Sequence, residues 1–240
     1  MSAKDFDLIV YGASGYIGRL VAEYLAQQSR RDPALKWAMA GRSKEKLAKV
    51  REEIGASLST PLLVAEASDP RSLKHMTART KVVLTTVGPY QLYGSALVAA
   101  CAESGTDYVD LCGEPGWMLA MIETHETTAK KTGARVVFSC GFDSIPFDLG
   151  VFFLQGEANE RFGGSCIEVK ARVRKMKGTL SGGTVASLKA TMAACRDPSM
   201  AKLLNSPFAL TPGFEGPQQP SDSEPRLDQS IGAWVAPFIM

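Results

Sequence analysis

The chain has 240 residues, of which 45% are hydrophobic and 22% are charged, and its formal net charge is +2. So balanced a charge gives no indication of nucleic acid or an anionic membrane as partner, and no apolar run approaches the ~20 residues of a membrane-spanning helix. The five cysteines are widely spaced without a C-x-x-C pair, which favours free thiols in a reducing cytoplasm over disulfides or a zinc site. We therefore expect a cytoplasmic protein with no metal.

A short apolar strand and a glycine-rich turn open the chain. The run from Leu8 to Tyr11 is typical of a strand buried on both faces, and G-x-x-G-x-x-G follows it before an apolar-periodic helix. Gly12 permits a tight turn, Gly15 lets the backbone approach a pyrophosphate, and Gly18 lets the helix pack on the strand. The context predicts a dinucleotide site at the helix N-terminus, with a simple tight turn as the alternative. The residues expected to bind the cofactor here are Gly12, Ala13, Ser14, Gly15, Tyr16, Ile17 and Gly18.

The second predicted strand ends in a basic residue where many NAD-dependent enzymes carry an acidic one. A helix from Tyr16 to Ser29 leads to this strand, Lys36 to Ala40, and the next residues are Gly41, Arg42 and Ser43. A guanidinium and a hydroxyl would bind a ribose 2′-phosphate, without a carboxylate to repel it. Arg42 and Ser43 therefore favour NADP(H) over NAD(H). Ser43 is also a suitable N-cap for a helix from Lys44 to Ile54.

A third strand is predicted from Pro61 to Ala65, and Asp69 follows it. Asp69 precedes a helix from Pro70 to Met76. Its carboxylate is suited either to the adenine amine of the cofactor or to capping this helix. The two roles remain equal alternatives.

The fourth strand, Val82 to Val87, ends in a loop where open α/β sheets hold their ligands. A helix from Ser95 to Ser104 follows this loop. The alternative to a binding loop is a simple Gly-Pro turn with a packed aromatic residue. The candidates to line the nicotinamide are Thr86, Val87, Gly88, Pro89 and Tyr90.

Two further strands and helices complete the alternating pattern. The strand from Asp107 to Leu111 precedes a helix from Pro115 to Lys131, and a sixth strand runs from Arg135 to Ser139. Asp143 resembles a helix N-cap, with Pro146 in the first turn of a helix that extends to about Gln155. The alternation predicts a doubly wound parallel sheet of the Rossmann type over residues 1–155.

The pattern changes over residues 156–240, where we expect part of an α+β second domain. A period-two alternation predicts a strand from Ser165 to Val173, and a glycine pair begins a helix from Gly182 to about Cys195. This pair either binds an anion or serves as a helix start. Residues from Asn205 to Ser230 are typical of a long loop or a disordered segment. The apolar run 232–240 is expected to dock on a neighbour or to continue into a longer chain.

The motifs GASGYIG, AGRS, TTVGPY, YVDLCGE, CGFDSIP and SGGT occur in this order. In them the chain resembles the saccharopine-dehydrogenase-like oxidoreductases, in particular the trans-acting enoyl reductase branch, over nearly its whole length. The resemblance implies an NADP(H)-binding Rossmann domain and a second domain that closes over the nicotinamide and often dimerises. A homodimer and peripheral membrane association are therefore left open. Relatives continue beyond this sequence, which puts the activity of this chain alone in doubt.

The resemblance implies reduction of an enoyl, lipid-thioester substrate by NADP(H) rather than turnover of saccharopine. A saccharopine site must neutralise several carboxylates, and no arginine cluster follows the predicted strands. A non-catalytic NADP(H)-binding sensor or scaffold is the other alternative. Tyr90 is the first candidate proton donor, followed by Cys112, Glu114 and Asp143. Each has a structural alternative: a packed aromatic ring for Tyr90, a small apolar side chain for Cys112, and a helix-start residue for the two acids.

Overall fold

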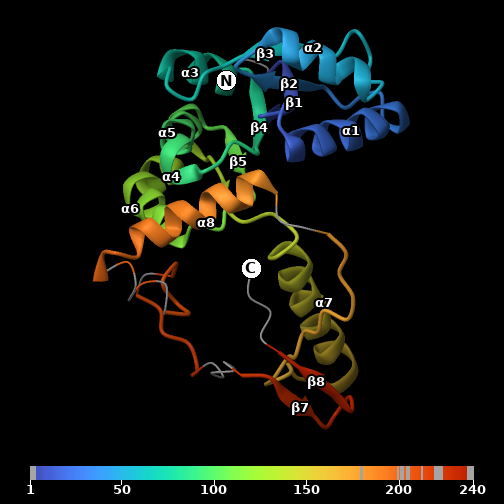
Figure 1. Cartoon of the computed structure of the whole chain (residues 1–240), viewed down its shortest axis with the longest axis vertical. Helices are drawn as coiled ribbons and strands as arrows, with labels where there is room; N and C mark the ends of the chain where they lie inside the picture. The colour runs from blue at the N-terminus through green and yellow to red at the C-terminus, as the bar shows by residue number, and fades with distance from the viewer. Residues whose placement is uncertain are drawn as a thin grey trace.

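A parallel sheet of six strands in the order β3-β2-β1-β4-β5-β6 forms the N-terminal part of the chain (Figure 1). The computed structural model describes residues 4–178, 181–198, 200, 203, 206–211, 213–218 and 224–236. The strands are β1 (Phe6–Tyr11), β2 (Trp37–Gly41), β3 (Leu62–Val64), β4 (Thr80–Thr85), β5 (Asp107–Val109) and β6 (Val136–Val137). This strand order is that of doubly wound dinucleotide-binding folds, which confirms the predicted class.

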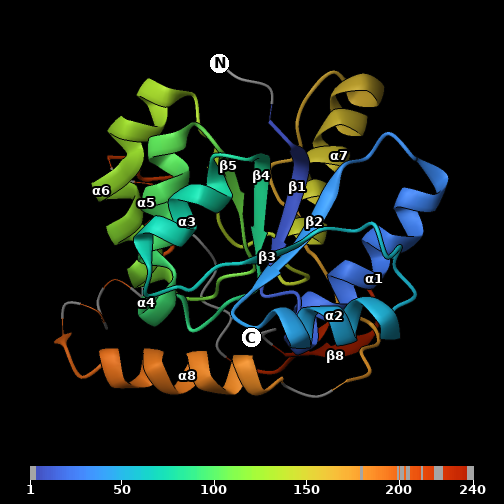
Figure 2. The ribbon, with the colours of Figure 1, turned by 90° about the horizontal axis from the view of Figure 1, so that it is seen from above.

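Helices cover both faces of the sheet because each central strand is apolar on both sides (Figure 2). On β1, Ile9 packs into the cluster beneath α3 (Pro70–Thr77), α5 (Ser95–Ser104) and α6 (Pro115–Thr132). The next residue, Val10, packs into the opposite cluster beneath α1 (Tyr16–Arg31) and α2 (Lys44–Glu53). Both side chains are fully buried.

The predicted strands and helices of this sheet all form, with boundaries that shift by a few residues. Helix α4 (Tyr90–Tyr93) is an addition that the sequence did not predict. It is a single turn, and its first N–H groups donate to Glu114 from a distant loop rather than to a local cap. Local patterns could not indicate a helix that depends on so distant an acceptor.

Helix α7 (Ile145–Phe162) extends past Gln155, where the sequence predicted its end. Glu157 pairs with Arg161 one turn later, and Gly163 ends the helix in a left-handed conformation with φ 70°. The predicted domain boundary between residues 155 and 156 falls inside this helix, and the division stays a prediction.

The predicted strand from Ser165 to Val173 is wrong, because the described backbone there is irregular. Alternation alone does not make a strand; a partner must accept and donate its hydrogen bonds. Among the described residues no strand pairs with this segment, and Ile167 is fully exposed. Arg172 instead forms an ion pair with Asp228 of the C-terminal hairpin.

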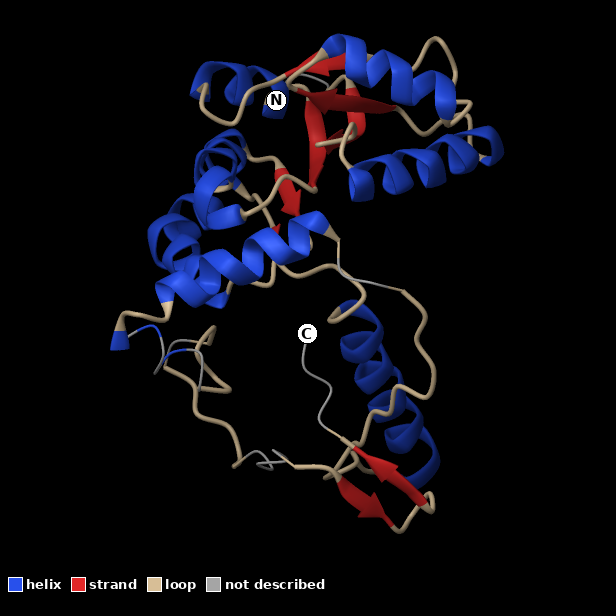
Figure 3. Ribbon diagram, in the orientation of Figure 1, coloured by secondary structure: helices blue, strands red, loops and turns tan. Residues whose placement is uncertain are grey.

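The remaining elements are helix α8 (Gly182–Ala194), as predicted, and an antiparallel hairpin of β7 (Arg226–Asp228) and β8 (Ala233–Val235). The end of the predicted apolar run, residues 237–240, and part of the predicted loop lie outside the described residues. Helix α8 crosses the end of the sheet, whereas α7 and the hairpin lie away from it (Figure 3). In the described part of the chain, no helix combines the length and apolarity that a bilayer crossing requires.

Candidate functional site

The glycine turn after β1 has the tight geometry that the sequence predicted. Gly12 has φ +90°, and its N–H donates to the Ala40 carbonyl over 2.9 Å. A Cβ on Gly15 would lie 3.3 Å from the Gly12 oxygen, and one on Gly18 would lie 2.1 Å from the same atom. The turn therefore has no room for a side chain at Gly18, where α1 packs against the end of β1.

The N-terminus of α1 is open to an anionic ligand. Gly15 is its N-cap without a side-chain hydrogen bond, and the first turn carries no acidic residue. The first N–H groups of a helix lack intrahelical acceptors and carry a partial positive charge. Ser14 and Tyr16 are exposed beside them, whereas Ala13 is fully buried in the core. A role for the Ala13 side chain is thus restricted to packing.

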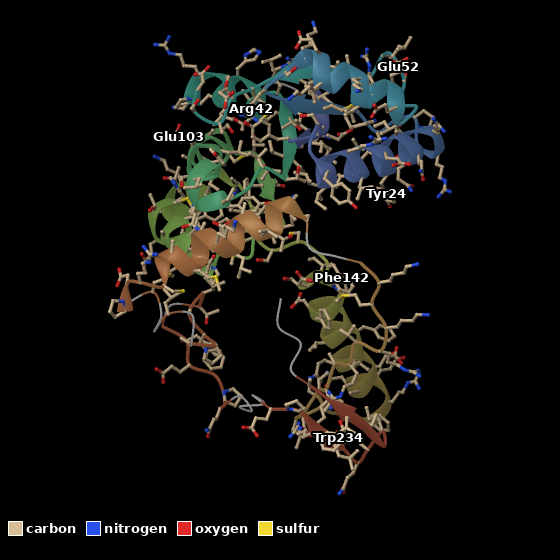
Figure 4. All side chains as sticks on the ribbon, viewed as in Figure 1. Tyr24, Arg42, Glu52, Glu103, Phe142 and Trp234 are labelled. Atoms are coloured by element: carbon tan, nitrogen blue, oxygen red, sulfur yellow. The ribbon has the colours of Figure 1, made fainter. Side chains whose placement is uncertain are left out.

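The ends of β2 and β3 carry the next predicted cofactor contacts. Arg42 is exposed after β2 (Figure 4). Ser43 caps α2 by accepting from the Lys46 N–H over 3.2 Å, and Asp69 caps α3 by accepting from the Arg71 N–H over 3.0 Å. The capping roles of Ser43 and Asp69 are confirmed, and their contacts with a cofactor stay predictions.

The loop after β4 adjoins the glycine turn. The hydroxyl of Thr86 would lie 2.8 Å from a Cβ placed on either Gly12 or Gly18. Thr86 therefore fills the space behind the turn. Val87 and Gly88 are partly buried, and Pro89 is buried.

Tyr90 is buried rather than directed into an open crevice. Its ring packs 5.6 Å from that of Trp117, and its hydroxyl accepts from the Leu111 N–H over 3.4 Å. Burial, followed by the nearby charge of Asp110, raises the pKa of Tyr90 well above its usual range. This geometry supports the packed-aromatic role, and proton donation by Tyr90 stays a prediction.

Cys112 and Asp143 lie in opposite environments. The thiol of Cys112 is buried and accepts from the Glu114 N–H over 3.3 Å. Burial raises the pKa of Cys112 far above that of an ordinary thiol. Asp143 is exposed in the turn before α7, whose N-cap is Ser144, so its predicted capping role is wrong by one residue. Cys112 lies in the same buried cluster as Tyr90, whereas Asp143 is exposed, so the structure does not bring all three side chains into one group.

Asp110 organises the carboxyl ends of β5 and β6; it belongs to the motif YVDLCGE, but it was not among the predicted site residues. One oxygen accepts from the backbone N–H groups of Cys112 over 3.0 Å and Ser139 over 2.8 Å. The other accepts from the Tyr108 hydroxyl over 2.8 Å. Ser139 has φ 59°, unusual for a residue with a side chain, and its hydroxyl donates to the Cys112 carbonyl. An acid at the end of a buried strand was the signal that could have identified Asp110.

The burial of the Asp110 carboxyl leads us to expect a specific pH dependence of the free energy of unfolding. Burial raises the pKa of its carboxyl, although the N–H of Cys112 and the Tyr108 hydroxyl oppose this. The pKa of Asp110 is therefore higher in the native state than in the unfolded state. The protonated carboxyl stabilises the native state fully below the unfolded-state pKa, and this stabilisation is lost as pH rises through the native-state pKa.

We therefore expect the free energy of unfolding of the wild type to fall relative to Asp110→Asn as pH rises through that interval. Urea denaturation of both proteins, from below the ordinary aspartate pKa to neutral pH, measures the difference. If the difference in the free energy of unfolding between the two proteins stays constant, or grows in favour of the wild type as pH rises, the pKa of Asp110 is not raised in the native state.

The described residues contain no group of three or more His, Cys, Asp or Glu side chains that could hold a metal ion. The geometry instead offers an anion-binding helix start, a basic residue after β2 and a loop after β4. All three follow strands at the carboxyl end of the sheet, where the strand order reverses between β1 and β4 and where open α/β sheets bind nucleotides.

Comparisons with known proteins agree with this geometry. Residues 8–137 match the family model described as the saccharopine dehydrogenase NADP binding domain. A protein of Mycobacterium tuberculosis strain H37Rv, provisionally named a trans-acting enoyl reductase, is 46% identical over 99% of this chain and 58% of its own length. The trans-acting enoyl reductase of Mycobacterium ulcerans is 44% identical over 98% of this chain and 58% of its own length. The chain thus spans less than two thirds of these relatives.

A solved structure shares the fold. Apo saccharopine dehydrogenase (L-Glu forming) from Saccharomyces cerevisiae superimposes with a TM-score of 0.50 over 66% of this chain and 32% of its own. The sequence identity is 17%, so this likeness concerns the fold alone.

Proposed function

Because this chain belongs to the saccharopine dehydrogenase family of NADP-binding proteins, we propose that it forms the cofactor-binding part of an NADP(H)-dependent enoyl reductase. The observation that carries the proposal is the pairing of a glycine turn at the start of α1, with no space for a side chain at Gly18, with Arg42 after β2. The first suits a pyrophosphate, and the second suits a 2′-phosphate. Enoyl reduction is favoured over saccharopine turnover by relatives of 40–46% identity that are named trans-acting enoyl reductases.

Different segments of the chain would bind different parts of the cofactor. The N–H groups at the start of α1 bind the pyrophosphate, and Arg42 binds the 2′-phosphate. The loop from Thr86 to Pro89 would line the nicotinamide and limit its movement. When bound, NADPH would supply the hydride for the substrate double bond, and a side chain or water would supply the proton. A lipid-thioester substrate and a homodimer are part of this proposal.

Arg42→Ala tests the 2′-phosphate contact. A charge-assisted hydrogen bond contributes about 1.5–3 kcal/mol, so we expect the dissociation constant for NADPH to rise roughly 10–100-fold. NADH lacks the phosphate and should lose little affinity. Calorimetric titration with both cofactors gives the comparison.

Arg31→Ala is the matched control, because Arg31 is exposed in the last turn of α1, at the opposite end from the glycine turn. It should leave both dissociation constants close to their wild-type values. Equal losses for NADPH and NADH in Arg42→Ala would refute the 2′-phosphate assignment.

Turnover separates the reductase from a sensor or scaffold. The full-length protein should oxidise NADPH in the presence of an enoyl thioester, and the absorbance of the reduced nicotinamide follows the reaction. NADPH binding without oxidation across a panel of chain lengths would favour the non-catalytic alternative. Formation of NADPH from NADP⁺ in the presence of saccharopine would instead favour the dehydrogenase chemistry, in which the substrate gives up the hydride.

A further inference from the structure

Glu114 joins three segments through one buried carboxylate. Glu114 is the N-cap residue of α6 and is 2% exposed. One oxygen accepts from the Tyr90 N–H over 2.9 Å, and the other accepts from the Gln91 N–H over 2.8 Å. The hydroxyl of Ser187 on α8 donates to the first oxygen over 2.8 Å. A carboxylate thus binds the start of α4 and the middle of α8 together.

The two backbone donors fix the orientation of this carboxylate. They are the first N–H groups of α4, which have no intrahelical acceptor, and they hold both oxygens in place. The Ser187 hydroxyl therefore meets an acceptor that is already positioned. Hydrogen bonds to a charged group contribute about 1.5–3 kcal/mol, more than a neutral pair.

Helix α8 buries little of its own surface. None of its residues is buried, and Leu188 and Met192 are largely exposed. Beyond Ser187, residues Thr191 and Ala194 line a hollow of about 190 Å³ that they share with Glu114 and Trp117. With so little buried surface, a single charge-assisted bond has a large share in holding the helix.

The same bond lies beside the predicted nicotinamide loop. A Cβ placed on Gly88 would lie 3.8 Å from the Ser187 hydroxyl oxygen. Helix α8 lies on the side of the sheet at which the strands finish (Figure 2), next to α4 and α6 rather than to β1 (Figure 1). The Glu114–Ser187 bond therefore holds α8 next to Gly88, in the loop that is predicted to line the nicotinamide.

We propose that Glu114 is a positioning residue that holds α8 as a roof over the nicotinamide end of the proposed cofactor site. It contacts the helix and the α4 turn, and it acts on the nicotinamide only through them. The roof excludes water from the reduced ring, which protects hydride transfer from side reactions. The roof function rests on the proposed function, whereas the attachment of α8 does not.

Hydrogen–deuterium exchange of the α8 amides tests the attachment. In Ser187→Ala we expect exchange in α8 to be at least tenfold faster, with the sheet unchanged. Ser187→Thr keeps the hydroxyl and should restore slow exchange. Glu114→Gln should also accelerate exchange in α8. The NH₂ group of glutamine would replace one carboxylate oxygen, and as a donor it cannot accept the hydrogen bonds that Glu114 now accepts.

Glu126→Gln is the matched control on the same helix α6. Glu126 is exposed and pairs with Lys130 one turn later, so its change should leave α8 unaffected. Unchanged α8 exchange in Ser187→Ala would overturn the proposal. So would acceleration in Glu114→Gln that is uniform over the sheet and α8, because it would mean that Glu114 only stabilises the fold.

The fluorescence of bound NADPH tests the roof itself. In Ser187→Ala we expect the dissociation constant to stay within threefold of the wild type, because the glycine turn and Arg42 are intact. The nicotinamide emission should fall toward that of NADPH in water, and Ser187→Thr should restore it. Wild-type emission in a variant with loosened α8 would refute the roof. If the wild type binds no NADPH, the proposed function fails, and the exchange data still decide whether Glu114 holds α8.

Discussion

Replacing Gly18 by alanine is expected to lower the affinity for NADPH by roughly 100-fold or more, equivalent to about 2.7 kcal/mol. The new Cβ would lie 2.1 Å from the Gly12 oxygen and 2.8 Å from the Thr86 hydroxyl. Both neighbours are held in place, the first as backbone and the second as a short side chain, so the turn or the helix must move. Overpacking of this kind costs about 1–3 kcal/mol, and here it displaces the N–H groups that would bind the pyrophosphate. Calorimetric titration with NADPH measures the loss.

Gly150→Ala is the control for this change. Gly150 also lies within a helix, α7, but no atom outside its own helix lies within 4 Å of the point that an alanine Cβ would occupy. Alanine there should raise the free energy of unfolding by about 0.5–1 kcal/mol and leave the NADPH dissociation constant unchanged. Wild-type affinity in a folded Gly18→Ala protein would show that the turn does not bind the cofactor.

The sheet and its glycine turn could be predicted because their signals are local. Val10 and its neighbours form an apolar run long enough to identify a buried strand, and the glycines follow at once. The steric requirement at Gly18 arises from Gly12, six positions earlier in the sequence. The capping roles of Ser43 and Asp69 are equally local, since each acceptor lies within three residues of its donor.

The rest of the candidate site depends on contacts between distant segments. Tyr90 follows a strand end, which made it a reasonable candidate, but Trp117 and Leu111 determine that it is buried. Glu114 was predicted as a proton donor or a helix-start residue, and its partner Ser187 lies 73 positions away. No spacing rule connects such residues, because the fold brings them together only after the sheet has formed.

The failure over residues 165–173 has a related cause. Val169 and Ala171 alternate with charged residues, as in a strand with one wet face. Period-two alternation describes which side chains could share a face, and it does not supply the neighbouring strand that the backbone needs. Helix α7, by contrast, was underestimated because its continuation past Gln155 rests on polar pairs rather than on apolar periodicity.

Replacing Trp117 by alanine is expected to lower the free energy of unfolding by about 3–5 kcal/mol. The ring packs 5.6 Å from Tyr90 and 5.4 Å from Phe138, and its indole N–H donates to the Ser95 hydroxyl over 2.9 Å. Alanine would leave a cavity in this cluster and an unpaired hydroxyl. Urea denaturation followed by circular dichroism measures the change. Because Tyr90 begins α4 directly after the predicted nicotinamide loop, we also expect weaker NADPH binding.

Trp234→Ala provides a control with the same change of side chain. Trp234 is 74% exposed on β8, away from the sheet (Figure 4), so its loss should change the unfolding free energy by no more than about 0.5 kcal/mol. Similar losses in the two variants would mean that the aromatic cluster around Trp117 does not stabilise the fold. If Trp117→Ala instead loses stability but keeps wild-type affinity for NADPH, the cluster does not position the loop after β4. The large loss should therefore come with weaker binding, because the same ring supports both the core and the residue that follows Pro89.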